Sequence, residues 1–287
     1  MGQHLNRAKR HFGADTRGLL EGGRYALLHT RSMEFDDLRP YVPGDDVRDI
    51  DWKATARSGT VLIKRFVSEK HHKILLVTDA GRNMTALAAG GETKRDVAAA
   101  ILGAFGLITL GRADEIGMVY GDGRGCASIR AGRGETHVEN MLEHFYRHTL
   151  ANPGVSDIES QLRYVATHFR RRMLVIVVSD EPDVTAGLIE VTARLAARHD
   201  VLWAMVSDMP AVSGDVDGYD VATGALVPSR TRLGRRLEAA YRRAESRRRA
   251  RLENFLTDHA IPFTTIGRSD EIRTRLTAMA EVFARAG

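Results

Sequence analysis

The run MLVIVVSD at residues 173–180 is the most apolar stretch of this 287-residue chain. Short continuous apolar runs of this kind are typical of strands that are buried on both faces of a parallel sheet. The run therefore predicts a central strand that ends at Asp180.

From residue 73 onwards, short apolar runs alternate with longer helix-compatible segments on both sides of this strand. The expected strands span 74–78, 115–120, 126–130, 201–206 and 262–266, and the expected helices span 93–110, 135–150, 157–170, 185–199, an arginine-rich stretch and a last segment from residue 270. Such alternation is typical of an α/β fold with a doubly wound, mostly parallel sheet and helices on both faces. Ligands of such sheets bind at the carboxyl ends of strands, where strand order reverses, which directs attention to Asp79 and Asp180.

The sequence before residue 73 has a different character and predicts two further regions. Residues 1–23 mix charge and glycine without a usable period, so we expect a loosely ordered lead-in. Residues 24–72 contain extended patterns such as VLIKRF at 61–66, separated by turn signals, and predict a β-rich N-terminal region. The α/β domain is then expected to occupy residues 73–287.

Composition limits the classes of partner and location. The chain carries 42 basic and 37 acidic residues, a formal net charge of +5, and the two signs are mixed over most of its length. No polyanion-attracting field over the whole molecule follows, so nucleic acid is not the expected partner. A single cysteine, Cys126, fits a reducing compartment, and no apolar stretch approaches the ~18 residues of a membrane span. We therefore expect a cytoplasmic protein without a membrane span.

The segment EFDDLRPYVPGDDVRDIDWKATARSGTVLIKRF at residues 34–66 holds the densest motif of the chain. Pro43 and Gly44 predict a tight turn, because proline presets one central dihedral angle and glycine accepts a positive φ at the next. Four carboxylates crowd behind this turn, those of Asp45, Asp46, Asp49 and Asp51. A calcium loop would need the glycine and the distal glutamate of an EF-hand, which are missing. We expect instead that the carboxylates pair with three arginines around one tryptophan, namely Arg39, Arg48, Arg57 and Trp52.

The same segment resembles the domain of unknown function 58 family in the order and spacing of its motif. The residues that carry the resemblance are Glu34, Phe35, Arg39, Tyr41, Pro43, Gly44, Asp45, Arg48, Ile50, Asp51, Trp52, Ala56 and Arg57. The resemblance implies a von Willebrand factor A-like fold and a partnership with MoxR-type AAA+ ATPases. It also implies a non-catalytic adaptor in the assembly or activation of client proteins, with this motif and the carboxyl end of the sheet as the docking surface.

The implied fold directs attention to a metal site after the first strand of the α/β domain. Such domains read D-x-S-x-S there and add a threonine from a second loop and an aspartate from a third. This chain reads DAGRN at 79–83, so that Gly81 and Asn83 replace the two serines. We expect no required cofactor and at most weak Mg²⁺ or Mn²⁺ binding, with Arg82 as the alternative cation. The candidate metal ligands are Asp79, Asn83, Thr136 and Asp180.

The remaining motifs of the sequence do not indicate an enzyme. His137, His144 and His148 share a helix face, but neither a matching carboxylate nor an HExxH order accompanies them for zinc. The stretch GGETK at 90–94 lacks the spacing of a phosphate-binding P-loop, and no nucleophile elbow G-x-S-x-G occurs. The glycines at 121–125 predict a hairpin between strands rather than a phosphate cradle. We expect no catalytic activity, with a metal-dependent hydrolase as the remaining enzyme alternative.

Ten arginines lie between Arg230 and Arg251. They offer an alternative function, that of a polyanion-binding protein for nucleic acid or acidic lipid. An apolar stripe at helical spacing runs through the same stretch, at Leu233, Leu237, Tyr241, Ala244, Leu252 and Phe255. The stripe favours a helix that packs on the sheet and turns a solvated basic face outward.

Overall fold

The computed structural model describes residues 2–13, 33–68, 73–112, 114–210 and 217–286. Its centre is a six-stranded sheet in the order β10-β7-β6-β3-β4-β5. The strands are β3 (Lys73–Asp79), β4 (Glu115–Asp122), β5 (Gly125–Gly132), β6 (Leu174–Ser179), β7 (Asp200–Val206) and β10 (Phe263–Ile266). Neighbouring strands pair in parallel except β4 and β5, which form an antiparallel hairpin. The expected mostly parallel sheet of an α/β fold is confirmed.

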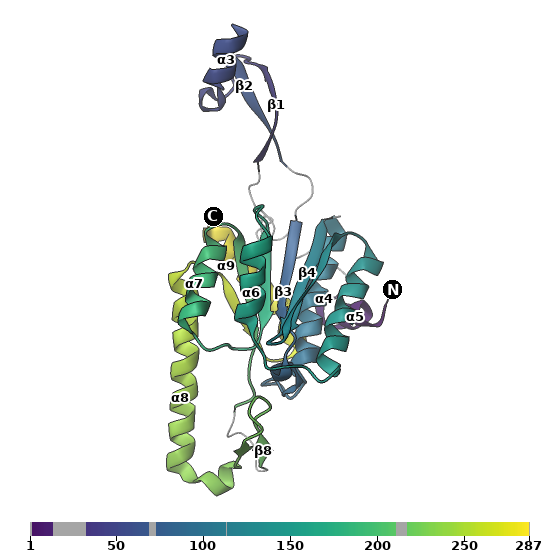
Figure 1. Ribbon diagram of the computed structural model, residues 1–287, viewed down its shortest axis with the longest axis vertical. Helices are drawn as coiled ribbons and strands as arrows, with labels where there is room; N and C mark the ends of the chain where they lie inside the picture. The colour runs from purple at the N-terminus through teal and green to yellow at the C-terminus, as the bar shows by residue number, and fades with distance from the viewer. Residues whose placement is uncertain (1, 14–32, 69–72, 113, 211–216, 287) are drawn as a thin grey trace.

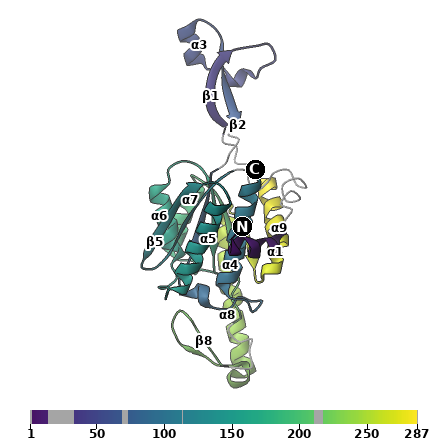
Figure 2. The same ribbon diagram turned by 90° about the vertical axis from the view of Figure 1, so that its right-hand side faces the viewer.

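Helices cover both faces of this sheet (Figures 1 and 2). One face carries α1 (Gln3–Phe12), α4 (Lys94–Arg112), α5 (Glu135–Leu150) and α9 (Ile272–Ala286). The other face carries α6 (Ile158–His168), α7 (Ala186–Ala196) and the C-terminal part of α8 (Arg230–Asp258). Each face has its own hydrophobic core, built from these helices and from the strands. The three layers leave the loops at the strand ends free to form sites.

Strand β6 shows how the sequence builds both cores at once. Leu174, Ile176 and Val178 join the core on the α4 side, whereas Val175 and Val177 join the core on the α6 and α7 side. All five side chains are at most 1% exposed, and β6 pairs with β3 on one side and β7 on the other. The predicted central strand is confirmed, and Asp180 begins the loop that follows it.

The N-terminal residues form a helix that the sequence analysis did not predict. Helix α1 buries three apolar side chains against the core, those of Leu5, Ala8 and Phe12. Glu139 of α5 accepts hydrogen bonds from the amides of His4 and Leu5, at 2.9 Å each. The expectation of a loosely ordered lead-in is therefore wrong for α1, because a short apolar face is enough to dock a helix on an existing core. Residues 14–23 of that region lie outside the described residues.

Residues 33–68 form an arm, seen at one end of the molecule in Figure 1. Its strands β1 (Met33–Pro40) and β2 (Leu62–Ser68) pair antiparallel, with the short helices η2 (Val47–Asp49) and α3 (Trp52–Ser58) between them. The described part of the predicted β-rich region thus contains two strands but also α3, which was not expected. The predicted tight turn is confirmed, because the Asp45 amide donates to the Val42 carbonyl at 3.1 Å and Gly44 has a φ of 109°.

The arm joins the sheet at the amino ends of the strands. Only residues 69–72 separate the end of β2 from the start of β3, a stretch of chain that reaches at most about 18 Å between Ser68 and Lys73. Strand β3 then runs away from the arm to Asp79 at the carboxyl end of the sheet. The family motif and the carboxyl end of the sheet are therefore two separate surfaces.

Helix α8 and a small hairpin, β8 (Gly218–Tyr219) and β9 (Leu226–Val227), extend beyond the carboxyl end of the sheet (Figure 1). The backbone of α8 breaks at Gly234, where φ is 71°. Leu252, Phe255 and Leu256 pack on the sheet, whereas Leu237 and Tyr241 remain 46% and 41% exposed. The expected apolar stripe therefore packs on the sheet only in its C-terminal half. No helix within the described ranges is long and apolar enough to cross a membrane.

Candidate functional site

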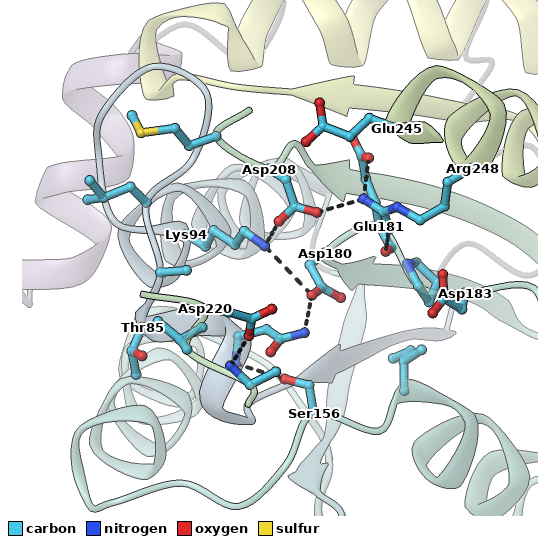
Figure 3. A pocket seen from close by; sticks show the side chains of 18 of the residues that line it. Thr85, Lys94, Ser156, Asp180, Glu181, Asp183, Asp208, Asp220, Glu245 and Arg248 are labelled. Atoms are coloured by element: carbon cyan, nitrogen blue, oxygen red, sulfur yellow. Dashed lines mark hydrogen bonds and ion pairs between the residues drawn. The ribbon is translucent and has the colours of Figure 1, made fainter. Parts of the chain in front are cut away.

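Loops at the carboxyl end of the sheet enclose a pocket of about 880 Å³ (Figure 3). Its walls come from the loops after β3, β6 and β7, from the starts of α4 and α6, and from the β8–β9 hairpin and α8. Strand order reverses here, since β3 lies between β6 and β4, and such places are the usual ligand sites of doubly wound sheets. The acidic and basic side chains that line the pocket are Asp157, Glu159, Asp180, Glu181, Asp183, Asp208, Asp220, Glu245, Lys94 and Arg248.

Asp79 ends β3 and is fully buried. Its Oδ1 accepts hydrogen bonds from the amides of Gly81 and Asp157, both at 3.2 Å. Its Oδ2 is buried without a hydrogen-bond partner among the described residues. Burial, together with repulsion from Asp180, raises the pKa of Asp79 to about 7. This carboxyl group therefore exchanges its proton near neutral pH.

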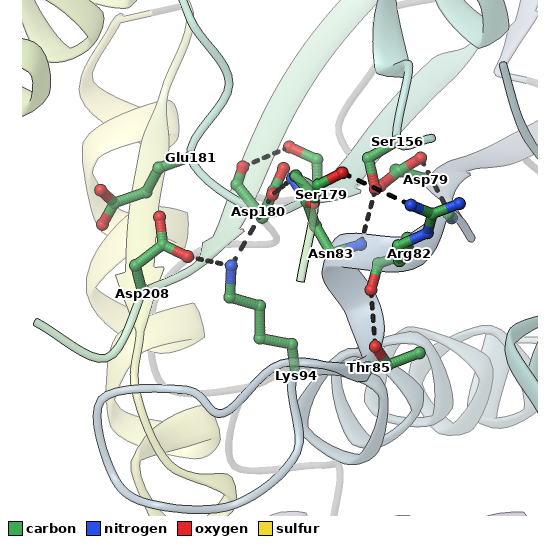
Figure 4. A network of polar contacts seen from close by, with 12 residues as sticks. Asp79, Arg82, Asn83, Thr85, Lys94, Ser156, Ser179, Asp180, Glu181 and Asp208 are labelled. Carbon is green, nitrogen blue, oxygen red and sulfur yellow. Dashed lines mark hydrogen bonds and ion pairs between the residues drawn. The ribbon is translucent and has the colours of Figure 1, made fainter. Parts of the chain in front are cut away.

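Asp180 faces Lys94, which the sequence analysis considered only as part of a P-loop pattern and set aside. Asn83 donates its side-chain amide to Asp180 Oδ2 at 2.7 Å, and Lys94 Nζ lies 3.7 Å from the same oxygen (Figure 4). Burial raises the pKa of Asp180, while Lys94 and Asn83 favour its charged form. Lys94 is itself only 2% exposed, so its ammonium group depends on these neighbours for its stability.

Lys94 belongs to a chain of alternating charges. It pairs with Asp208, which also accepts a hydrogen bond from Arg248 of α8 at 2.9 Å. Arg248 and Arg249 in turn donate to the buried Glu181, at 3.2 and 3.0 Å. These residues are termed the charge network: Asp180, Lys94, Asp208, Arg248, Glu181 and Arg249. Each buried charge in it meets an opposite charge, which is the condition under which buried ions are tolerated.

The loop before α4 fixes the position of Lys94. The Lys94 amide donates to the Ala86 carbonyl at 2.8 Å, and Ala88 forms a β-bridge with Asp208. Glu92 accepts hydrogen bonds from the amide and the hydroxyl of Ser269, at 2.8 and 2.6 Å. A positive charge at the start of a helix opposes the helix dipole, so the carboxylates of the charge network hold Lys94 there.

The described residues do not fit the metal site that the resemblance implied. A Cβ built on Gly81 would lie 2.5 Å from the Ser156 Cα, so a serine ligand has no room at this position. Asp180 Oδ2 already accepts from Asn83 and faces Lys94. Mg²⁺ needs near-octahedral oxygen ligands, and an ammonium group beside them repels it. No group of three His, Cys, Asp or Glu side chains that could hold a metal ion occurs in the described part of the chain.

Thr136, the predicted threonine ligand, lies at the opposite end of the sheet. Strand β5 runs antiparallel to β4 and pairs Gly132 with Ile116, near the start of β4. Thr136 follows four residues later, in the first turn of α5, so this prediction is wrong. The hydroxyl group near Asp79 comes instead from Ser156, which favours the charged form of Asp79 and accepts a hydrogen bond from the Asn83 backbone amide at 3.1 Å.

Arg82 and the histidines of α5 also differ from the expectations. Arg82, the expected cation between the two aspartates, donates to the Ala222 carbonyl of the β8–β9 loop at 3.4 Å. His137 Nε2 lies 2.8 Å from the Ile116 carbonyl, and His148 Nε2 lies 3.1 Å from Asp122 Oδ2. These two partners lie at opposite ends of β4, so the histidines do not converge on one metal ion.

On the arm, separate local pairs replace the expected arginine and carboxylate network. Arg39 donates two hydrogen bonds to Asp45, at 2.6 and 2.8 Å, which lower the pKa of Asp45. Arg48 pairs with Asp46 at 2.7 Å. Asp51 caps α3 by accepting from two amides of its first turn, at 2.9 and 3.0 Å. The predicted pairing of arginines with these carboxylates is confirmed for Arg39 and Arg48, but not as one network around Trp52, because Asp51 caps the helix instead.

The arm also exposes apolar side chains around its motif. Trp52 is 68% exposed, and Val42, Val47 and Val61 are 41 to 61% exposed. Backbone hydrogen bonds hold their segments together, since the Tyr41 amide donates to the Val61 carbonyl at 2.9 Å. These four side chains are termed the arm patch. The side chains of Glu34 and Phe35 lie outside the described ones, and Arg57 is exposed.

Comparison with known proteins agrees with the motif of the arm. The family model described as "Protein of unknown function DUF58" matches residues 37–251. Uncharacterized proteins of Mycobacterium tuberculosis and Mycobacterium bovis are 29% identical over 215 residues, which cover 73% of this chain and 67% of theirs. A solved structure, the PilB minor pilin from Streptococcus sanguinis, is similar with a TM-score of 0.45 and 9% identity, over 78% of this chain and 64% of that one. The family match covers most of the arm, five of the six strands of the sheet and most of α8, and this chain therefore belongs to the DUF58 family of proteins of unknown function.

Proposed function

We propose that this chain is a non-catalytic adaptor that binds a MoxR-type AAA+ ATPase in the assembly or activation of client proteins. The observation that carries the proposal is the arm patch, an exposed apolar surface on a hydrogen-bonded arm. Exposed apolar patches mark interaction sites, and tryptophan is frequently the central residue of protein interfaces. The family motif builds this surface, since Gly44 forms its turn and Asp51 caps the helix that begins with Trp52.

A von Willebrand factor A-like fold is part of the proposal. Numbered in chain order, the six strands of the sheet lie in the order 6-5-4-1-2-3, with the third strand antiparallel to the second. Asp79 ends the first of these strands and Asp180 follows the fourth. This arrangement supports the fold that the motif of the arm implied.

The charge network supports a role without catalysis. Acid, base and nucleophilic catalysis need a side chain that is free to reach a substrate atom. Lys94 and Arg248, the two cations that line the pocket, both donate to carboxylates, and Asp180 accepts from Asn83. Because the site does not fit a metal ion, the structure also gives no reason to prefer a metal-dependent hydrolase.

Titration of a purified MoxR-type ATPase with this chain tests the adaptor proposal. Trp52→Ala should weaken binding at least tenfold, because a central interface tryptophan contributes about 2 kcal/mol or more. The matched control is Tyr241→Ala, which removes an exposed aromatic side chain from α8 and should leave the affinity unchanged. Calorimetry with and without nucleotide measures both. Equal affinities of the two variants, or no binding by the wild-type chain, would contradict the proposal.

One observation favours a second function, polyanion binding by α8. Arg235, Arg236, Arg243 and Arg247 are exposed on α8. At 3.6 residues per turn, these four residues fall within about 120° of one helix face. A steep loss of affinity for DNA or acidic lipid with rising salt would support this function. Exchange of all four arginines for glutamine without a loss of binding would count against it.

A further inference from the structure

Three carboxyl groups converge at the edge of the sheet where the pocket lies. Asp79 ends β3, Asp180 follows β6 directly, and Asp208 comes two residues after β7. The three strands are neighbours, so the residues after them are brought to the same edge. Carboxylates that gather away from water repel one another unless a cation or hydrogen-bond donors intervene. The arrangement therefore needs a positive charge close by.

The chain supplies this charge from the start of α4. Lys94 Nζ lies 3.7 Å from Asp180 Oδ2 and pairs with Asp208, so that it bridges the loops after β6 and β7 (Figure 4). Its side chain is 3% exposed, and the loop before it is anchored through the Ala86 carbonyl and through Glu92. Lys94 is thus a fixed part of the site and not a mobile surface cation.

The groups around Lys94 are arranged for an ammonium ion. Asn83 presents its amide nitrogen, and not its oxygen, to Asp180. Gly81 contributes no oxygen ligand and has no space for one, because the Ser156 backbone lies against it. Asp79 directs Oδ1 to two backbone amides. Asn83 therefore presents nitrogen, and Gly81 presents no ligand at all, where a metal ion would need oxygen.

We infer that Lys94 is a built-in cation of this site and that it takes the place of the divalent ion that the resemblance implied. The site is then complete at any concentration of divalent metal ions. Chelators should change neither the stability of the chain nor its binding of partners. The inference does not rest on the adaptor proposal, because failure to bind an ATPase leaves the composition of the site unchanged.

Binding of Mn²⁺ to the full chain tests the inference. The wild-type chain should bind no Mn²⁺ at this site below about 1 mM, as followed by electron paramagnetic resonance and calorimetry. Lys94→Gln keeps a hydrogen-bond donor and Lys94→Met keeps the length of the side chain, and both remove the charge. Each should gain Mn²⁺ affinity at least tenfold over wild type and should show a Tm that rises with Mn²⁺ at constant ionic strength. Adding Asp180→Asn to Lys94→Gln should abolish the gain.

Two results would overturn the inference. One is micromolar Mn²⁺ binding by the wild-type chain that is lost in Asp180→Asn, since the site would then be a metal site with Lys94 present. The other is a folded neutral variant that binds Mn²⁺ no better than wild type. A neutral variant that does not fold in metal-free buffer is refolded in 10 mM Mn²⁺ and, as the control, in NaCl of equal ionic strength. Rescue by Mn²⁺ supports the inference, and absence of rescue in both neutral variants counts against it.

Discussion

Gly81 and Ser156 lie so close together that a Cβ on Gly81 would approach the Ser156 Cα to 2.5 Å. The contact joins the loop after β3 to the loop before α6. A hydrogen bond from the Arg82 amide to the Gly154 carbonyl, at 2.7 Å, joins the same two loops. Glycine at position 81 therefore allows the two loops to close over Asp79. Packing of these two loops leaves no room for a serine side chain at position 81.

Gly81→Ser should destabilise the chain. The added atoms meet backbone atoms of Ser156, which cannot rotate away, and overpacking of this kind costs about 1–3 kcal/mol. Gly218→Ser is the matched control, because a Cβ at Gly218 would meet nothing within 4 Å. Urea denaturation of both variants measures the difference. An unchanged midpoint for Gly81→Ser would show that the two loops separate at little cost.

Asp79→Asn should stabilise the chain more at pH 8 than at pH 5. The folded state raises the pKa of Asp79 from 3.8 to about 7, so the folded chain holds this proton more tightly than the unfolded chain does. The associated stability is present below pH 3.8 and is lost as the pH rises toward and through 7. Asparagine does not ionise, and its oxygen still accepts from the two amides. The gain at pH 8 should exceed the gain at pH 5 by roughly 1–3 kcal/mol in the free energy of unfolding.

The control for this prediction is Asp220→Asn, which removes a carboxylate that lines the pocket and accepts from backbone amides of its own loop. Subtraction of its effect at each pH leaves the part of the Asp79→Asn effect that belongs to Asp79. A pH-independent effect of Asp79→Asn would show that Asp79 stays charged throughout this range.

The α/β fold could be predicted because its signals are local. The run at 173–180 alternates between two cores, and the predicted helix at 135–150 coincides with α5. Helices α1 and α3 were missed for a different reason. Both are short, and α1 depends on Glu139 of α5, a contact that its own residues do not reveal. Asp51, the cap of α3, directly precedes that helix and was a readable start signal.

The charge network could not be predicted, because its members come from distant segments. Lys94, Asp208 and Arg248 meet only when β6 and β7 lie side by side and α8 returns over the same edge. Alternation of strands and helices does not reveal strand order. The error at Thr136 was avoidable, since the predicted hairpin at 121–125 already returns the chain to the amino end of the sheet. The next segment to reach the carboxyl end contains Ser156.

Asp51→Ala should destabilise the arm by about 1 kcal/mol, the usual cost of a lost helix N-cap, and not by the larger cost of an unpaired buried arginine. Asp51→Asn keeps an acceptor for the same amides and serves as the control. Hydrogen exchange of the amides in α3 measures the local effect. The two tryptophans separate local from global change, because Trp52 is exposed while Trp203 is fully buried. Loss of the Trp203 signal together with that of Trp52 would show that the arm and the sheet unfold as one unit.

His199→Gln should reduce the fall in the free energy of unfolding that the chain undergoes as the solution becomes acidic. His199 lies between α7 and β7 and is buried, and burial together with the charge of Arg198 lowers its pKa below the ordinary 6.5, although Asp200 and the Phe169 backbone oppose this shift. The unfolded chain therefore binds a proton at this residue more readily than the folded chain does. Stability falls as the pH drops below 6.5 toward the lowered value, and it is unaffected by this group above 6.5. Glutamine does not titrate, so the free energy of unfolding of the variant should fall less between pH 7.5 and 5.5 than that of wild type, whatever its absolute value. His168→Gln, which replaces an exposed histidine at the end of α6, is the matched control for the exchange of histidine for glutamine. Equal slopes for His199→Gln and wild type in urea titrations would show that the folded protein accommodates a charged imidazole at this position.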